Sequence, residues 1–126
     1  MKTAVFHPDE GQEYWFHEGC HILEVCNRED DPDVSIARAR VAPGATTHWH
    51  RLEGVGERYL IVQGAGLVET GSLKAQPVAS GDLVSIPPDT PQRIHNSGKI
   101  DLIFYAICTP RFTPACYHSI EAGETS

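Results

Sequence analysis

Residues 44–64 read G-A-T-T-H-W-H-R-L-E-G-V-G-E-R-Y-L-I-V-Q-G, and this stretch contains the strongest structural signal in the chain. His48 and His50 are two positions apart, so in an extended strand they would face the same side. A loop with two glycines follows, and the β-branched and aromatic residues after Glu57 predict a returning strand. A hairpin can therefore bring Glu57 back opposite the two histidines.

Two imidazoles and one carboxylate on one face, with other coordination positions open, form the ligand set of non-heme Fe(II) enzymes. The same set also suits Mn, Ni, Co or Zn. The sequence therefore predicts a site for one divalent transition metal without selecting the element. The alternative is a pair of exposed histidines on a strand edge, an arrangement that also occurs by chance.

The length of 126 residues is that of one ordinary domain, long enough to bury a core without disulfides. The chain has 10 basic and 17 acidic residues, and the lack of a basic run argues against a nucleic-acid partner. No apolar run approaches the roughly 20 residues of a membrane helix, and the first residues lack the apolar stretch of a signal peptide. We therefore expect a cytoplasmic protein without a membrane partner. The four cysteines form no C-x-x-C pair, which argues against a zinc ribbon.

Short candidate strands alternate with glycine and proline turns along the chain. The expected strands are residues 20–27, 35–42, 57–62, 67–70, 83–86, 92–96 and 101–109. The last of these is the most apolar, so we expect it to be central, and residues 28–33 are expected as an acidic turn. No stretch shows helical periodicity over a helix length, so the pattern predicts an all-β sandwich or barrel.

Residues 35–42 alternate arginine with small or apolar side chains. Arg38 and Arg40 share one face of this strand, while Ala37 and Ala39 take the other. An inward arginine face would be able to hold an anionic substrate, whereas an outward face would be solvated or part of an interface. Ordinary burial statistics favour the outward orientation.

Two motifs resemble those of the cupin superfamily, whose members are small β-barrels of the jelly-roll type. The residues that match the first motif are Gly44, His48, His50, Glu57 and Gly64. The gap between His50 and Glu57 is longer than in the family pattern, so Glu53 is the alternative carboxylate. We prefer Glu57 because it opens the returning strand and keeps the family spacing to Gly64.

The second cupin motif is matched at Gly81, Pro87 and Asn96. Gln92 stands where the family usually has a histidine that serves as the fourth metal ligand. Its amide oxygen would be a weaker, neutral fourth ligand, or the side chain would hydrogen-bond a ligand or a water instead. His95 is an odd number of residues away, so on a strand it points to the other face.

The resemblance implies an all-β, double-stranded β-helix or jelly-roll barrel like that of small single-domain bacterial cupins. The single domain would span residues 1–126, with an N-terminal arm and strand at 1–34, the conserved barrel at 35–108 and a wrapped tail at 109–126. His48, His50, Glu57 and Gln92 are the implied metal ligands. Small cupins also imply a homodimer that takes a small-molecule ligand or substrate.

The implied function is a metal-dependent enzyme that acts on a small oxygenated organic substrate. With Fe(II) this would be a dioxygenase, and with a Lewis-acid metal an isomerase, decarboxylase or cyclase. Tyr59 would share the inward face of Glu57, which makes it a candidate acid, base or substrate-orienting group; a core tyrosine with a bonded hydroxyl is the alternative. A non-catalytic small-molecule or metal-binding module is the alternative function, since both need a lined pocket.

Overall fold

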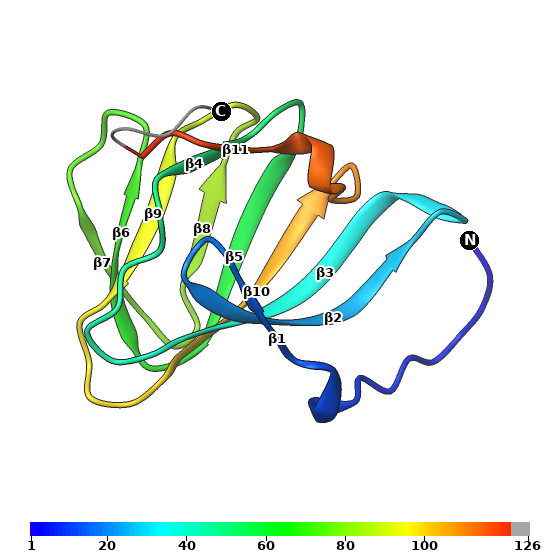
Figure 1. Ribbon diagram of the computed structural model, residues 1–126, viewed down its shortest axis with the longest axis horizontal. Coiled ribbons are helices and arrows are strands. Elements are labelled where there is room, and N and C mark those ends of the chain that lie inside the picture. Colours follow the sequence, from blue (N-terminus) through cyan, green and yellow to red (C-terminus); the bar gives the residue numbers. More distant parts are fainter. Residues whose placement is uncertain (122–126) are drawn as a thin grey trace.

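The structure is a computed structural model that describes residues 1–121, and its two antiparallel sheets face each other (Figure 1). The first sheet is built, in spatial order, from β1 (Tyr14–Phe16), β2 (Cys20–Arg28), β3 (Asp31–Val41), β10 (Leu102–Thr109), β5 (Gly56–Gln63) and β8 (Leu83–Ile86). The second contains β11 (Tyr117–Ser119), β4 (His50–Leu52), β9 (Gln92–Asn96), β6 (Ala65–Thr70) and β7 (Gln76–Ala79). The predicted jelly-roll fold is confirmed.

The apolar strand near the C-terminal end occupies the central place expected for it. β10 lies between β3 and β5, pairing along its length with both. One expected boundary was wrong: β3 already begins at Asp31, which pairs with Arg28 of β2, so residues 28–33 are not all turn. The two strands instead form a long hairpin that extends away from β6 and β7 (Figure 1).

The core fills only part of the space between the sheets. Val41, Ile61, Ile94 and Leu102 are fully buried there, and each such side chain contributes roughly 1.5–3 kcal/mol by its burial. On β3 and β10, by contrast, the inward positions carry Ala37, Ala39 and Ala106. These short side chains leave room at one end of the barrel, which is where the pocket lies.

The alternating arginines of β3 point outward, as burial statistics favoured. Arg38 Nη2 lies 2.6 Å from an oxygen of Glu10, and Arg40 Nη2 lies 2.6 Å from an oxygen of Glu13. Glu10 belongs to the short 3-10 helix η1 (Glu10–Gln12). The ion pairs therefore hold the N-terminal segment against the outer face of the sheet.

The tail after β10 wraps back over the second sheet. It contains the second 3-10 helix, η2 (Pro114–Cys116), and β11, which pairs with β4; residues 122–126 of the predicted tail lie outside the described part. Within residues 1–121, no helix is both long enough and apolar enough to cross a bilayer.

Candidate functional site

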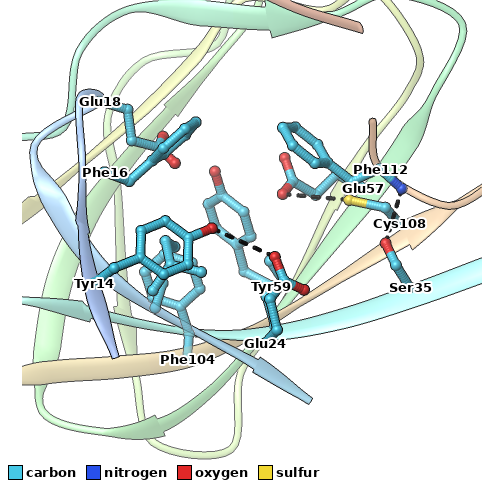
Figure 2. A pocket seen from close by; sticks show the side chains of 14 residues that line it. Tyr14, Phe16, Glu18, Glu24, Ser35, Glu57, Tyr59, Phe104, Cys108 and Phe112 are labelled. Atoms are coloured by element: carbon cyan, nitrogen blue, oxygen red, sulfur yellow. Dashed lines mark hydrogen bonds between the residues drawn. The ribbon is translucent and has the colours of Figure 1, made fainter. Parts of the chain in front are cut away.

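A pocket opens between the β1–β2 hairpin and the inner faces of β3, β5 and β10 (Figure 2). Its walls combine aromatic, carboxyl and small side chains. They come from Tyr14, Phe16, Glu18, Ile22, Glu24, Ser35, Ala37, Ala39, Glu57, Tyr59, Phe104, Ala106, Cys108 and Phe112. Figure 2 shows Glu18 and Glu57 on opposite sides, with the hydroxyl of Tyr59 between them.

Glu18 is placed by the tight turn that joins β1 to β2. In this turn Gly19 adopts a positive φ of 102° and its N–H donates to the carbonyl of Phe16 at 3.0 Å. The turn directs the Glu18 carboxyl toward the second sheet, where Oε2 lies 3.2 Å from Nε2 of His50. The sequence alone gave no signal for Glu18, because its partner is remote along the chain.

His50 is oriented by its other ring nitrogen. Nδ1 lies 2.7 Å from the carbonyl oxygen of His48, and because a carbonyl only accepts, Nδ1 carries a proton and donates it. Burial lowers the pKa of His50, so the ring is held neutral. Nε2 therefore presents its lone pair toward Glu18.

The carboxyl group of Glu18 can donate a proton to this lone pair when it is protonated. Burial raises the pKa of Glu18 to about 7, against the hydrogen bond with Cys20 and the charge of His48, which both lower it. A protonated Glu18 can therefore donate to Nε2 of His50 near neutral pH. The same two atoms, without the proton, can flank a cation.

Glu57 enters the pocket from the start of β5. Its residue is only 8% exposed, and Oε1 has no hydrogen-bond partner among the described residues. Oε2 lies 3.7 Å from the thiol sulfur of Cys108, the residue opposite Glu57 in the β5–β10 register. Burial first, and the charge of Glu18 second, raise the pKa of Glu57 to about 7, while His50, Gln92 and Cys108 act to lower it.

Tyr59 and Gln92 form one buried polar pair beneath the pocket. The Tyr59 hydroxyl donates to Oε1 of Gln92, and its ring packs against Phe104 at 4.3 Å between centroids. Burial raises the pKa of Tyr59 well above its usual value, so the hydroxyl keeps its proton. Gln92 also lies directly opposite His50 in the β4–β9 register.

The structure brings some of the predicted site residues together and leaves others apart. His50, Glu57, Tyr59 and Gln92 are all buried, and of these Glu57 and Tyr59 line the pocket. His48 precedes β4 and is half-buried, so the two histidines do not share one strand. The alternative carboxylate, Glu53, is exposed and pairs with His118. His95 faces away from the pocket and contacts the Thr46 hydroxyl at 2.7 Å.

The donors around His50 fit a divalent metal ion chemically. Among residues 1–121, no three His, Cys, Asp or Glu side chains are grouped closely enough to hold an ion as they stand. His50 and Glu18, however, place a nitrogen and an oxygen 3.2 Å apart, and two ligands at about 2.1 Å from a metal and at right angles are about 3 Å apart. Glu57 adds a buried carboxylate oxygen without a partner among the described residues, so the types of donor present suit a divalent ion.

Comparison with known proteins identifies the family. The model of the Cupin domain family matches residues 37–108, more than half of the chain. The chain belongs to the cupin family. A relative, the uncharacterized protein MJ1618 of Methanocaldococcus jannaschii, is 34% identical over 115 residues, which cover 90% of this cupin and 91% of the relative.

Solved structures share the cupin fold at lower identity. KdgF from Halomonas sp. is 22% identical, with a TM-score of 0.75, over 86% of this chain and 96% of its own. Pac13 of Streptomyces, described as a nucleoside dehydratase, is 18% identical, with a TM-score of 0.73, over 94% of this chain and 92% of its own. At such identities the likeness establishes the cupin fold and shows that this fold supports enzymes.

Proposed function

We propose that this cupin is a metal-dependent enzyme that acts on a small oxygenated organic molecule held in the barrel pocket. The observation that carries the proposal is the His50–Glu18 pair. Its nitrogen and oxygen are 3.2 Å apart, and Glu18 lines the pocket. The imidazole ring is fixed by a carbonyl on its far side, as in many metal-bound histidines.

His50, Glu18 and Glu57 would hold the ion, with His48 and Gln92 as further predicted ligands. When bound, a divalent ion supplies positive charge that polarises a carbonyl or hydroxyl oxygen. Imidazole and carboxylate donors suit Fe, Ni, Mn, Co and Zn alike. The element that the protein selects would decide between oxygen chemistry and Lewis-acid chemistry.

The remaining pocket residues favour Lewis-acid chemistry, in which negative charge develops on a substrate oxygen. Tyr59 keeps its proton because burial raises its pKa, so it would act as a donor and not as a base, exchanging its hydrogen bond to Gln92 Oε1 for one to such an oxygen. The rings of Phe104 and Phe112 exclude water from the same space. This combination suits an isomerase, lyase, decarboxylase or cyclase. The dehydration named for Pac13 is a reaction of this kind, which supports the choice by analogy of fold only.

Elemental analysis of untagged protein purified without a chelator tests the proposal. We expect about one equivalent of a divalent transition metal in the wild type and its loss in His50→Ala. His95→Ala is the matched control, because it removes an imidazole on the other face of β9. Failure to take up any of the five metals when each is offered would contradict the proposal and favour a metal-free binding module.

Turnover can be sought without knowing the substrate. The metal-loaded protein is incubated in D₂O with pools of small hydroxy and keto compounds, and NMR detects loss of carbon-bound proton signals. We expect exchange or conversion of at least one compound with wild type and none with Tyr59→Phe or after chelation. The homodimer, which light scattering can test, and the cytoplasmic location stay predictions.

A further inference from the structure

The mouth of the pocket carries a third carboxylate that the proposed metal site does not use. Glu24 lies on β2, on the same face as Ile22, and it is exposed. Its Oε1 accepts a hydrogen bond from the Tyr14 hydroxyl at 3.4 Å (Figure 2). Together with Glu18 and Glu57, it extends the acidic lining from the buried end of the pocket to solvent.

No positive side chain balances these carboxylates at the pocket wall. Of the described residues that line the pocket, none is Lys, Arg or His. Arg38 and Arg40, on the neighbouring strand, point to the outer face and are already paired with Glu10 and Glu13. An anionic molecule would therefore meet carboxyl groups and no positive side chain at the pocket wall.

Aromatic rings form much of the remaining wall. They belong to Tyr14, Phe16, Tyr59, Phe104 and Phe112. Phe16 and Phe112 meet edge to face, with 6.4 Å between their centroids, and Figure 2 shows Tyr14 and Phe16 on one side of the pocket and Phe112 on the other. The faces of such rings attract organic cations, including quaternary ammonium groups.

The buried end of the pocket also indicates a ligand. The Glu57 residue is only 8% exposed, and its Oε1 atom has no hydrogen-bond partner in the part of the chain that the structure describes. A buried polar atom without a partner is costly unless something occupies the space beside it. A ligand in the pocket could therefore supply the hydrogen bond that Oε1 of Glu57 lacks.

We propose that the pocket selects a small organic cation, a protonated amine or quaternary ammonium compound with an oxygenated end. The ammonium group would lie beside Tyr14 and Glu24, and the oxygenated end would reach Tyr59 and Glu57. This assignment rests on the proposed function for the inner end. A divalent ion there balances the charges of Glu18 and Glu57, and Glu24 then leaves one negative charge for a monocation.

Calorimetric titration with three molecules of similar shape tests the selectivity. The probes are choline, the uncharged alcohol in which carbon replaces the choline nitrogen, and the anion tert-butylacetate. We expect choline to bind at least about five-fold more tightly than the alcohol, and the anion to bind more weakly than either. Glu24→Gln should reduce the choline preference. Glu29→Gln, at an exposed position in the loop between β2 and β3, should leave the preference intact.

Equal affinity for choline and the alcohol, tighter binding of the anion, or no binding of any probe would overturn the inference. Because each preference is a ratio measured within one protein, a modest loss of stability in a variant does not affect it. The titrations are run on metal-loaded and on EDTA-treated protein. A choline preference in a protein that takes up no metal would overturn only the proposed function, and metal uptake without the preference would overturn only the choice of substrate class.

Discussion

The imidazole of His50 and the carboxyl of Glu18 face each other across 3.2 Å, although they come from different sheets. Glu18 lies in the turn that joins β1 to β2 in the first sheet, and His50 begins β4 in the second. The backbone reinforces the contact, since the N–H of His48 donates to the carbonyl of Glu18 at 2.7 Å. The hairpin thus brings the Glu18 carboxyl beside His50 at one end of the barrel.

Glu18→Gln tests the contribution of this hairpin to metal binding. The variant keeps the size of the side chain but removes the negative charge beside Nε2 of His50. We expect metal affinity to fall by roughly 10–100-fold, measured by competition with a chromophoric chelator. Glu29→Gln removes one charge from the exposed loop between β2 and β3, outside the pocket, and should bind metal like the wild type. Unchanged affinity in Glu18→Gln would exclude this residue from the site.

The raised pKa of Glu57 predicts a pH-dependent stability of the metal-free protein. Below about pH 4.5 the carboxyl is neutral in both states, so its burial carries no charge penalty. Above about pH 7 it is ionised in both states, and the folded protein carries the cost of burying the charge. The free energy of unfolding should therefore decrease between these values, by up to about 3 kcal/mol from this group.

Urea denaturation at pH 5, 6, 7 and 8 in the presence of EDTA measures this effect. The quantity of interest is the difference between wild type and Glu57→Gln, because His50, whose pKa is lowered by burial, contributes an opposite slope to both proteins. We expect Glu57→Gln to gain stability relative to wild type as the pH rises. A constant difference across the series would show that Glu57 titrates normally.

Tyr59→Phe tests the buried hydrogen bond below the pocket. The substitution keeps the packing against Phe104 but leaves Oε1 of Gln92 without its donor. We expect the free energy of unfolding to fall by about 1–3 kcal/mol, measured from urea denaturation. Tyr105→Phe, on the outer face of β10, is the control and should change stability by less than about 0.5 kcal/mol. Equal effects would argue that the Tyr59 hydroxyl is not a structural donor.

Gly64, the last residue of the first cupin motif, has no room for a side chain, whereas Gly54, in another loop, does. Gly64 has a φ of 85°, and a Cβ there would lie 2.9 Å from the carbonyl oxygen of Asp101. We expect Gly64→Ala to cost roughly 2–3 kcal/mol of stability by thermal or urea denaturation. Gly54 has a φ of 68° with open space around it, so Gly54→Ala should cost only about 1 kcal/mol. A smaller loss in Gly64→Ala than in Gly54→Ala would contradict the close approach of the two loops.

Local side-chain patterns were enough to predict most of the strands and the faces on which their key side chains lie. Period-two alternation predicted β9 at residues 92–96 and placed the arginines of β3 on one face, because a pleated strand turns successive side chains to opposite faces whatever surrounds it. Burial statistics then favoured the outer face for the arginines, where the structure has them. The same local rule placed Glu57 and Tyr59 on the inner face of β5 and His95 on the outer face of β9. Motif spacing was enough to indicate the family, which the family model confirmed.

Which remote side chains meet could not be predicted from the sequence. The pairing of Glu18 with His50 depends on how a tight turn of one sheet approaches the edge of the other. The bond between Tyr59 and Gln92 likewise crosses from β5 to β9. The open pocket arises because alanines on β3 and β10 come together in one register. These contacts join positions far apart in the chain, so they are set by sheet packing and register, for which a local pattern of side chains carries no information.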